Sequence, residues 1–187
     1  MKNTNEPTEK LKLFVSYAHE DANFLKRLKV HLARAIYDYG FDFWDDSRIN
    51  LGDKWANEIE DALNESSIVI LLISADFLSS NFIVNQELPK ILIKERKAGT
   101  RVIPVIIGPC GFDDDPILSQ FQALNSPEEY IAQFGKYKQD EYWDLLRRKV
   151  RKAIENILEE RATQAEAEQI ALVAKPNGQT KQRKKVS

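Results

Sequence analysis

The sequence contains very few residues of the kinds that form covalent cross-links or zinc sites. Of its 187 residues, one is a cysteine, Cys110, and two are histidines. A single cysteine excludes an intrachain disulfide, and we therefore expect a cytoplasmic protein, because disulfides belong to oxidising compartments. One cysteine and two histidines also leave little material for a zinc site, so we expect no metal.

Long apolar runs and a strong net charge are also lacking. The longest apolar runs, 68–73 and 102–107, are far too short to span a bilayer, and the polar first ten residues carry no signal-peptide core. A net charge of −2 gives no general attraction to nucleic acid or to an anionic membrane. We therefore expect neither as a partner. The composition that remains, 43% hydrophobic and 30% charged, is typical of a globular protein.

Short apolar runs alternate with helical patterns along most of the chain. The runs predict strands at 11–17, 41–44, 68–74 and 101–107, with a weaker one at 130–134. The helical patterns fall at 24–39, 54–65, 82–98 and 141–160. This alternation predicts a parallel sheet covered by helices on both faces. Such sheets bind ligands beyond the carboxyl ends of their strands, where the strand order reverses, so the loops after the first three strands are the place to look.

Glycine and proline mark expected ends and irregularities of these elements. Gly40 is expected to end the first helix. Pro89 lies inside the third helical pattern and predicts a kink or a break into two pieces. Pro104 lies inside the fourth strand and indicates an edge or irregular position. Loops are predicted at 45–53 and 75–81.

The chain is expected to contain one domain with a segment on either side. Residues 1–10 are expected to be a disordered lead-in, and residues 11–160 the domain. Residues 161–187 are expected to form a helical extension followed by a polar linker or tail, which leads either to a further module, such as a C-terminal sensor, or simply to the end of the protein.

Three motifs follow the first three strands in order. The first strand ends in Ser16-Tyr17 and is followed by Glu20-Asp21. The second ends in Trp44-Asp45, followed by a loop with a glycine, and the third is followed by the pattern Ser74-x-x-Phe77-x-x-Ser80 and then by Glu87-Leu88. Together they resemble the motifs of the Toll/interleukin-1 receptor (TIR) domain family, prokaryotic type, over roughly residues 11–160. The resemblance implies an α/β, flavodoxin-like three-layer sandwich with a five-stranded parallel sheet in the order 2-1-3-4-5.

The resemblance also implies an activity, because many TIR domains cleave the bond between nicotinamide and ribose in NAD. The catalytic glutamate of that family corresponds to Glu87. The chemistry agrees: the pyridinium ring leaves as neutral nicotinamide, so no general acid is needed and one carboxylate can stabilise the oxocarbenium-like ribose. Attack by water gives ADP-ribose, and intramolecular attack gives a cyclic ADP-ribose isomer. NAD is then a substrate, and no cofactor is expected.

Two further sets of residues follow from the resemblance. The expected substrate-binding residues are Phe14, Ser16, Tyr17, Asp45, Ser79, Asn81 and Phe82. The expected assembly loop, through which TIR domains associate with one another, contains Asp46, Arg48, Ile49, Gly52 and Trp55.

The sequence departs from the family in one position and leaves a second function open. Several members carry an aromatic residue four positions before the glutamate, where this chain has Ile83, and its aromatic Phe82 is five before. The leading hypothesis is an NAD glycohydrolase or cyclase that acts as the effector of a bacterial antiphage immune system and is activated by self-association. The alternative is a non-enzymatic signalling or scaffold module. A response-regulator or flavodoxin-type module is disfavoured, because no matching acidic pair, lysine or phosphate-binding Ser/Thr run is present.

Overall fold

The computed structural model describes residues 10–45, 55–81 and 83–173. Its strands are β1 (Lys12–Ser16), β2 (Asp42–Trp44), β3 (Ile68–Ile73) and β4 (Arg101–Ile106). Its α-helices are α1 (Ala22–Tyr39), α2 (Trp55–Glu65), α3 (Ala75–Ser79), α4 (Leu88–Ala98) and α5 (Lys136–Val173). Shorter helical turns are η1 (His19–Asp21), η3 (Ile83–Glu87), η4 (Leu118–Gln120), η5 (Pro127–Glu129) and η6 (Ile131–Gln133). The chain divides into two compact units, Met1–Ala153 and Ile154–Ser187.

The four strands form one parallel sheet in the order β2-β1-β3-β4. Leu13 of β1 pairs with Phe43 of β2 on one side and with Ile68 of β3 on the other. The predicted α/β class, parallel sheet and first four positions of the strand order are confirmed. Since the chain leaves β1 toward β2 and later returns on the opposite side to form β3, the strand order reverses between β1 and β3.

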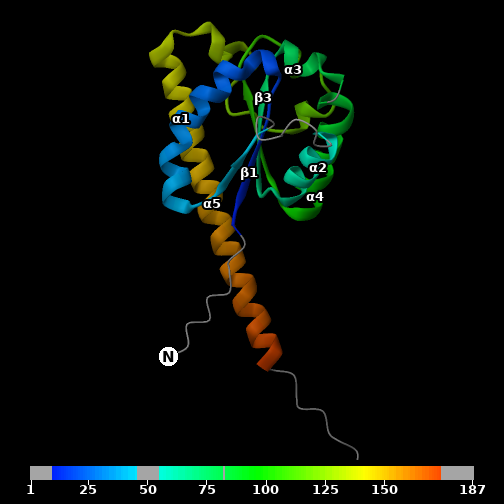
Figure 1. The fold of residues 1–187 in the computed structure, drawn as a ribbon, viewed down its shortest axis with the longest axis vertical. Coiled ribbons are helices and arrows are strands. Elements are labelled where there is room, and N and C mark those ends of the chain that lie inside the picture. The colour runs from blue at the N-terminus through cyan, green and yellow to red at the C-terminus, as the bar shows by residue number, and fades with distance from the viewer. Residues whose placement is uncertain (1–9, 46–54, 82, 174–187) are drawn as a thin grey trace, which may run out of the picture. The chain divides into compact units, whose positions relative to one another are not determined.

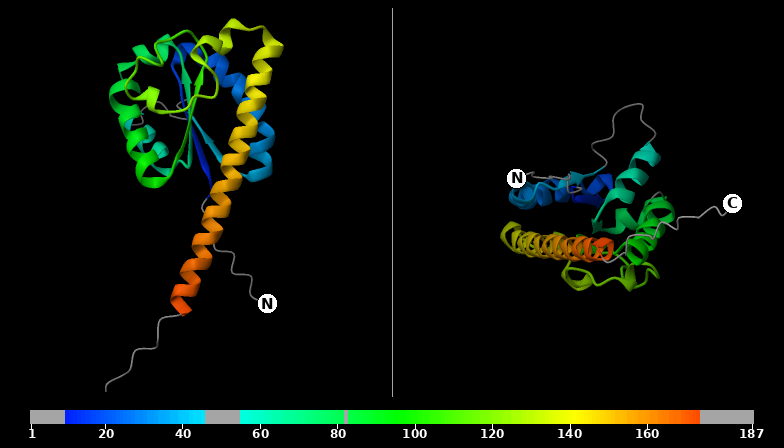
Figure 2. Two further views of the ribbon diagram at one scale, coloured as in Figure 1. Left: turned by 180° about the vertical axis from the view of Figure 1, so that it is seen from behind. Right: turned by 90° about the horizontal axis from the view of Figure 1, so that it is seen from below.

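Helices cover both faces of the sheet in the first unit (Figures 1 and 2). Helix α1 and residues 136–153 of α5 lie over one face, and α2 and α4 lie over the other. The side chains of β3 are buried along its whole length, as expected for a strand covered on both sides. Val69, Leu71 and Ile73 belong to the core cluster that also contains residues of α2 and α4.

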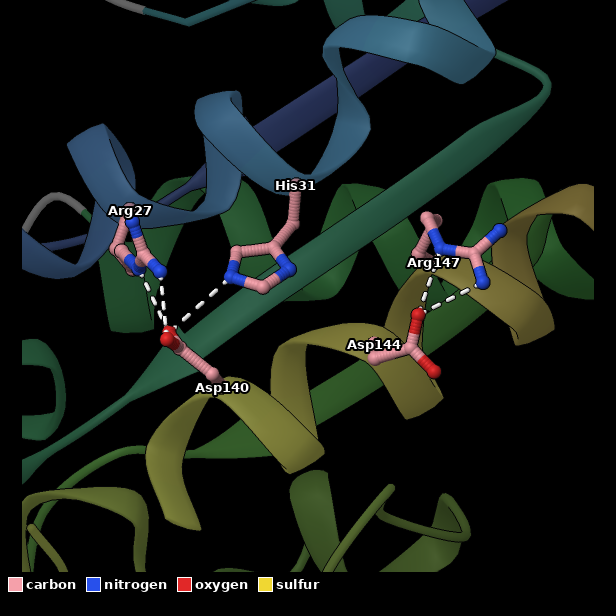
Figure 3. Close-up of polar contacts among 5 residues, drawn as sticks. All are labelled: Arg27, His31, Asp140, Asp144 and Arg147. Carbon is pink, nitrogen blue, oxygen red and sulfur yellow. Dashed lines mark hydrogen bonds and ion pairs between the residues drawn. The ribbon is translucent and has the colours of Figure 1, made fainter. Parts of the chain in front are cut away.

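Polar contacts join α1 to α5 within the first unit (Figure 3). The Arg27 guanidinium donates to both carboxylate oxygens of Asp140, at 2.7 and 2.6 Å, and His31 Nε2 lies 3.2 Å from the same carboxylate. The bidentate Arg27 contact lowers the pKa of Asp140 below its usual value. Arg147 pairs with Asp144 on α5 itself. The contacts of Arg27 and His31 with Asp140 join the two helices, whereas the Arg147 pair lies within α5.

The predicted fifth strand is not present at residues 130–134. That segment contains the 3-10 helix η6, and only Ile131 is buried in it, so its side chains do not alternate as those of a strand would. The adjoining edge of β4 is instead covered by separate contacts. Asn125 presents its side-chain amide to Ile106, accepting from the backbone N–H at 3.1 Å and donating to the carbonyl at 2.9 Å. The backbone N–H of Leu124 donates to Pro104 O.

Two expected boundaries are also corrected. The predicted loop at 75–81 contains the helix α3, because the Ser74 hydroxyl accepts a hydrogen bond from Phe77 N and caps a helical turn. The predicted helix at 141–160 begins earlier, at Lys136, and α5 continues to Val173, into the segment where a helical extension is expected. Gly40 ends α1 with a left-handed conformation, φ +62°, as predicted.

The helical segment at 82–98 is divided as Pro89 predicts. Residues Ile83–Glu87 form a π-helical turn, and α4 starts at Leu88 with Pro89 in its first turn. A proline is tolerated there because the first backbone N–H groups of a helix have no intrahelical partner. Glu87 thus lies at the junction of the two pieces. Among the described residues, no helix is long and apolar enough to cross a membrane.

Candidate functional site

A pocket of about 310 Å³ lies at the carboxyl end of the sheet, where the strand order reverses. Its lining comes from the end of β1 and the turn after it, the end of β2, α2, α3 and η3. The lining residues are Phe14, Val15, Ser16, Tyr17, Ala18, His19, Glu20, Trp44, Ile59, Asp76, Ser79, Ser80, Ile83 and Glu87. The volume is at the lower end of the range for small-molecule sites, roughly 300–1,000 Å³.

Glu87 is the buried carboxylate of this pocket. Its residue is 6% exposed, and its Oε2 accepts a hydrogen bond of 2.6 Å from the hydroxyl of Ser16. The two residues are 71 positions apart and meet because β1 ends beside the turn η3. A carboxylate that is held by a hydroxyl and screened from bulk water acts strongly on any positive charge placed next to it.

The π-helical turn that carries Glu87 is a local irregularity at the site. In a π-turn the backbone hydrogen bond spans five residues instead of four, and such turns occur frequently at functional sites. Ile83, four positions before Glu87, is buried and lines the same pocket. The position at which several members of the resembled family carry an aromatic residue therefore presents an aliphatic side chain here. Phe82 lies outside the described residues.

Two aromatic rings form the apolar base of the pocket. Phe14 and Trp44 are stacked, with ring centroids 5.0 Å apart and an interplanar angle of 10°. Both are buried, and both belong to the core cluster. Their ring faces contact one another, so we assign Phe14 to the support of the pocket rather than to stacking on a ligand. Tyr17 is half-buried and lies edge-on to His19, with ring centroids 6.1 Å apart.

Carboxylates dominate the charge of the pocket. Its lining contains Glu20, Asp76 and Glu87, and within the described part of the chain it contains no lysine or arginine. The local potential therefore favours a cationic ligand group over an anionic one. Elsewhere, no three His, Cys, Asp or Glu side chains of the described residues come together as a metal site would require.

The structure brings some of the expected substrate-binding residues together and not others. Phe14, Ser16, Tyr17 and Ser79 line the pocket with Glu87. Asp45 does not: it is 1% exposed and its carboxylate pairs with Lys29 at 2.7 Å. Asn81 is exposed and lies outside the lining.

Of the expected assembly-loop residues, one lies within the part of the chain that the structure describes. Trp55 begins α2, whereas Asp46, Arg48, Ile49 and Gly52 lie outside the described residues.

Some residues at the site were not found from the sequence. Glu20 and Asp76 line the pocket as exposed acids. Glu20 lies in the first motif, but the motif alone does not place its side chain in the pocket, and the sequence around Asp76 is that of an ordinary surface residue. Behind them, the buried Asp21 accepts a hydrogen bond of 2.6 Å from Ser74. Asp21 and Ser74 each belong to a motif that follows a strand, but neither motif indicates that the two side chains meet.

The comparisons with known proteins point to one family. The family model described as "TIR domain" matches residues 13–146. The uncharacterized protein y4lF of Sinorhizobium fredii is 29% identical over 104 residues, which are 56% of this chain and 32% of that protein. The TMV resistance protein N of Nicotiana glutinosa is 29% identical over 129 residues, which are 68% of this chain and 11% of that protein. The chain thus spans a third or less of either relative.

A solved structure was also matched. It contains the TIR domains of the activated Roq1 resistosome, which directly recognizes the pathogen effector XopQ. The match has 22% sequence identity and a TM-score of 0.43, and covers 74% of this chain and 82% of that chain.

Proposed function

Since the chain belongs to the TIR domain family, we propose that it cleaves the nicotinamide–ribose bond of NAD, with Glu87 as the catalytic carboxylate. The observation that carries the proposal is the burial of Glu87 beside Ser16, in a pocket at the reversal of the strand order. Family membership supports it, because the family includes members that cleave NAD.

The pocket suits the positively charged half of this substrate. The pyridinium ring of NAD is a cation, and the lining supplies three carboxylates near it. When the bond between C1′ of the ribose and the ring nitrogen breaks, its electron pair goes to the nitrogen and nicotinamide leaves neutral. The positive charge then develops on the ribose, where Glu87 stabilises it through its charge and through hydrogen bonds to ribose hydroxyls.

The second step completes the reaction. Water that attacks C1′ loses a proton and gives ADP-ribose, while attack by a hydroxyl or the adenine of the same molecule gives a cyclic isomer. Ser16 holds the Glu87 carboxylate in place during both steps through its hydrogen bond of 2.6 Å. Both outcomes require the same catalytic carboxylate.

The diphosphate of NAD is anionic, and the described lining contains no lysine or arginine that could pair with it. We therefore include self-association in the proposal: a second copy of the chain supplies positive groups at the mouth of the pocket. We propose in addition that the activity serves a bacterial antiphage immune response. The similarity to a plant protein named for resistance to a virus supports an immune role. A sensor module beyond residue 187 would supply the activating signal.

Replacement of Glu87 tests the activity. We expect Glu87→Gln, which keeps the size of the side chain and removes its charge, to lower kcat for nicotinamide release about 100-fold or more. Ser16→Ala leaves the carboxylate but removes its hydrogen bond, and we expect a loss of about tenfold. The measurement is nicotinamide release from NAD, followed by chromatography and mass spectrometry, which also identifies the product.

The matched control is Glu95→Gln, a glutamate of α4 that does not line the pocket. Its activity should equal that of the wild type. The proposal fails if the wild type and Glu87→Gln consume NAD equally slowly over a wide range of protein concentrations. A chain that is inactive but forms oligomers would favour the scaffold function instead.

A further inference from the structure

The pocket has two sides that come from separate segments of the chain. We call them wall A, formed by His19 and Glu20 of η1, and wall B, formed by Asp76, Ser79 and Ser80 at α3. Directly next to wall A lies Asp21, and directly before wall B lies Ser74. The Ser74 hydroxyl donates a hydrogen bond of 2.6 Å to Asp21 Oδ2 across 53 positions of sequence.

The carboxylate of Asp21 does not cap its own helix, although its position at the start of α1 suggests that role. Asp21 is the N-cap residue of α1, where an aspartate commonly accepts a hydrogen bond from the first backbone N–H groups of its own helix. It makes no such bond. Its side chain contacts Ser74 instead, so it joins two segments rather than capping one.

The hydroxyl of Ser74 is both a hydrogen-bond donor and a hydrogen-bond acceptor. While its hydroxyl donates to Asp21, the same oxygen accepts from the backbone N–H of Phe77 at 3.1 Å and so caps α3. A chain of hydrogen bonds therefore runs from the first turn of α3 to the end of η1, and each bond strengthens the next. The segment that follows β4 lies against Ser74, since a Cβ atom added to Gly108 would lie 3.4 Å from the Cβ of Ser74.

The surroundings show that this pair lies close to the mouth of the pocket. Both residues are buried, at 7% exposure for Asp21 and 5% for Ser74. Burial raises the pKa of Asp21, the bond from Ser74 opposes that rise, and the charges of Asp76 and Glu20 add to it. Glu20 belongs to wall A, and Asp76 belongs to wall B.

We propose that Asp21 and Ser74 form a clasp that sets the spacing of wall A and wall B. Neither residue lines the pocket, so both are positioning residues that act through the walls they hold. Breaking the clasp should loosen both walls together and weaken ligand binding, while Glu87 and Ser16 keep their own contact. The proposal rests on the proposed function only where NAD serves as the probe.

Amide hydrogen exchange of the full chain tests the clasp without any ligand. Wall A is reported by the Asp21 amide, which donates to Ala18 O, and wall B by the Leu78 amide, which donates to Ser74 O. We expect Ser74→Ala to speed exchange at Asp21, and Asp21→Ala to speed exchange at Leu78, by about tenfold in each case, as expected for one buried hydrogen bond.

The control is Ser66→Ala. Ser66 is a buried serine just before β3 whose hydroxyl donates to Ala62 O at 2.6 Å, so this variant removes a comparable bond at the opposite end of the strand. It should change neither reporter amide. The clasp is disproved if each variant speeds amide exchange only in its own segment. That outcome is faster exchange at Leu78 alone for Ser74→Ala, and at position 21 alone for Asp21→Ala.

Turnover of NAD provides the second test. We expect Ser74→Ala and Asp21→Ala each to raise KM about tenfold, the affinity equivalent of one buried hydrogen bond, with kcat changed less than about twofold. The double variant should be no worse than Ser74→Ala alone, because Ser74→Ala has already removed the bond that Asp21→Ala removes.

Conservative variants that keep the bond should rescue binding. Ser74→Thr retains the hydroxyl and Asp21→Asn retains an oxygen acceptor, so both should return KM toward the wild-type value. Additive losses in the double variant, or no rescue, would overturn the clasp. If the wild type does not cleave NAD, the proposed function is rejected but the clasp is not, because the exchange experiment tests the clasp without NAD.

Discussion

Three carboxyl groups are buried among the described residues, and their environments differ. Asp45, after β2, pairs with the ammonium group of Lys29. Asp21 and Glu87 accept hydrogen bonds from the hydroxyls of Ser74 and Ser16. A hydroxyl compensates for lost hydration without neutralising the charge. Glu87 lines the pocket, so its buried carboxylate can act on a ligand directly, whereas Asp21 does not line it.

The raised pKa of Asp21 predicts a pH dependence of stability. Because the folded state holds this proton more tightly than the unfolded chain, the folded chain binds more protons from the ordinary aspartate pKa of 3.8 up to the raised value. The contribution of Asp21 to the free energy of unfolding therefore falls as the pH rises through that window. Asp21→Asn cannot titrate, so its free energy of unfolding relative to wild type should increase with pH and then level off. Urea unfolding at a series of pH values measures this, and a difference that does not change with pH would contradict it.

At the scale of elements, the strands and the longer helices could be predicted because their signal is local. The run Ile68–Ile73 is apolar throughout and is buried throughout. Gly40 and Pro89 also act locally, since one adopts a left-handed conformation and the other lacks a backbone N–H. These features do not depend on distant parts of the chain.

The elements that were missed depend on single tertiary contacts. Helix α3 has only five residues, and the hydroxyl that caps it also contacts Asp21 of another segment. At the edge of β4, the amide of Asn125 pairs with the backbone groups of Ile106 that a neighbouring strand would use, and residues 131–133 form η6 instead of a strand. A sequence pattern contains no information about which asparagine meets a sheet edge.

The edge contact of Asn125 can be tested by its cost in stability. The side chain makes three hydrogen bonds, two to Ile106 and one to Glu129 O, and it is buried. We expect Asn125→Ala to lower the free energy of unfolding by about 3 kcal/mol, because it leaves buried backbone groups of β4 without partners. Chemical denaturation gives this value.

The variant Asn125→Asp supplies the comparison. It keeps an acceptor for the Ile106 N–H but replaces the donor that faces two carbonyl oxygens, so it should be at least as destabilising at neutral pH as Asn125→Ala. A loss within about 0.5 kcal/mol for either variant, the range of ordinary surface substitutions, would show that the edge contact does not support β4.

At the scale of the whole molecule, the location of the site could be predicted better than its composition. A parallel sheet with a reversal of strand order places a site between β1 and β3, and the pocket is there. The meeting of Ser16 with Glu87 over 71 positions requires the packing of η3 against β1, which no motif contains. The role of Glu87 itself came from the family resemblance.

Self-association predicts that activity depends on protein concentration. If a second copy completes the site, the specific activity for NAD should rise with concentration and then reach a plateau, as mass action requires. Parallel measurements of NAD turnover and of molar mass by light scattering should give the same midpoint. Constant specific activity across the range in which the molar mass changes would show that one chain is sufficient.

The carboxylates that line the pocket also bear on how the reaction ends. Under the proposed reaction the ring carries one positive charge when it enters and none after the bond breaks. The attraction from Glu20, Asp76 and Glu87 therefore acts on the substrate ring and largely disappears for the released nicotinamide. The carboxylates that attract the substrate ring therefore bind the neutral nicotinamide weakly, so under the proposed reaction nicotinamide dissociates readily before the next turnover.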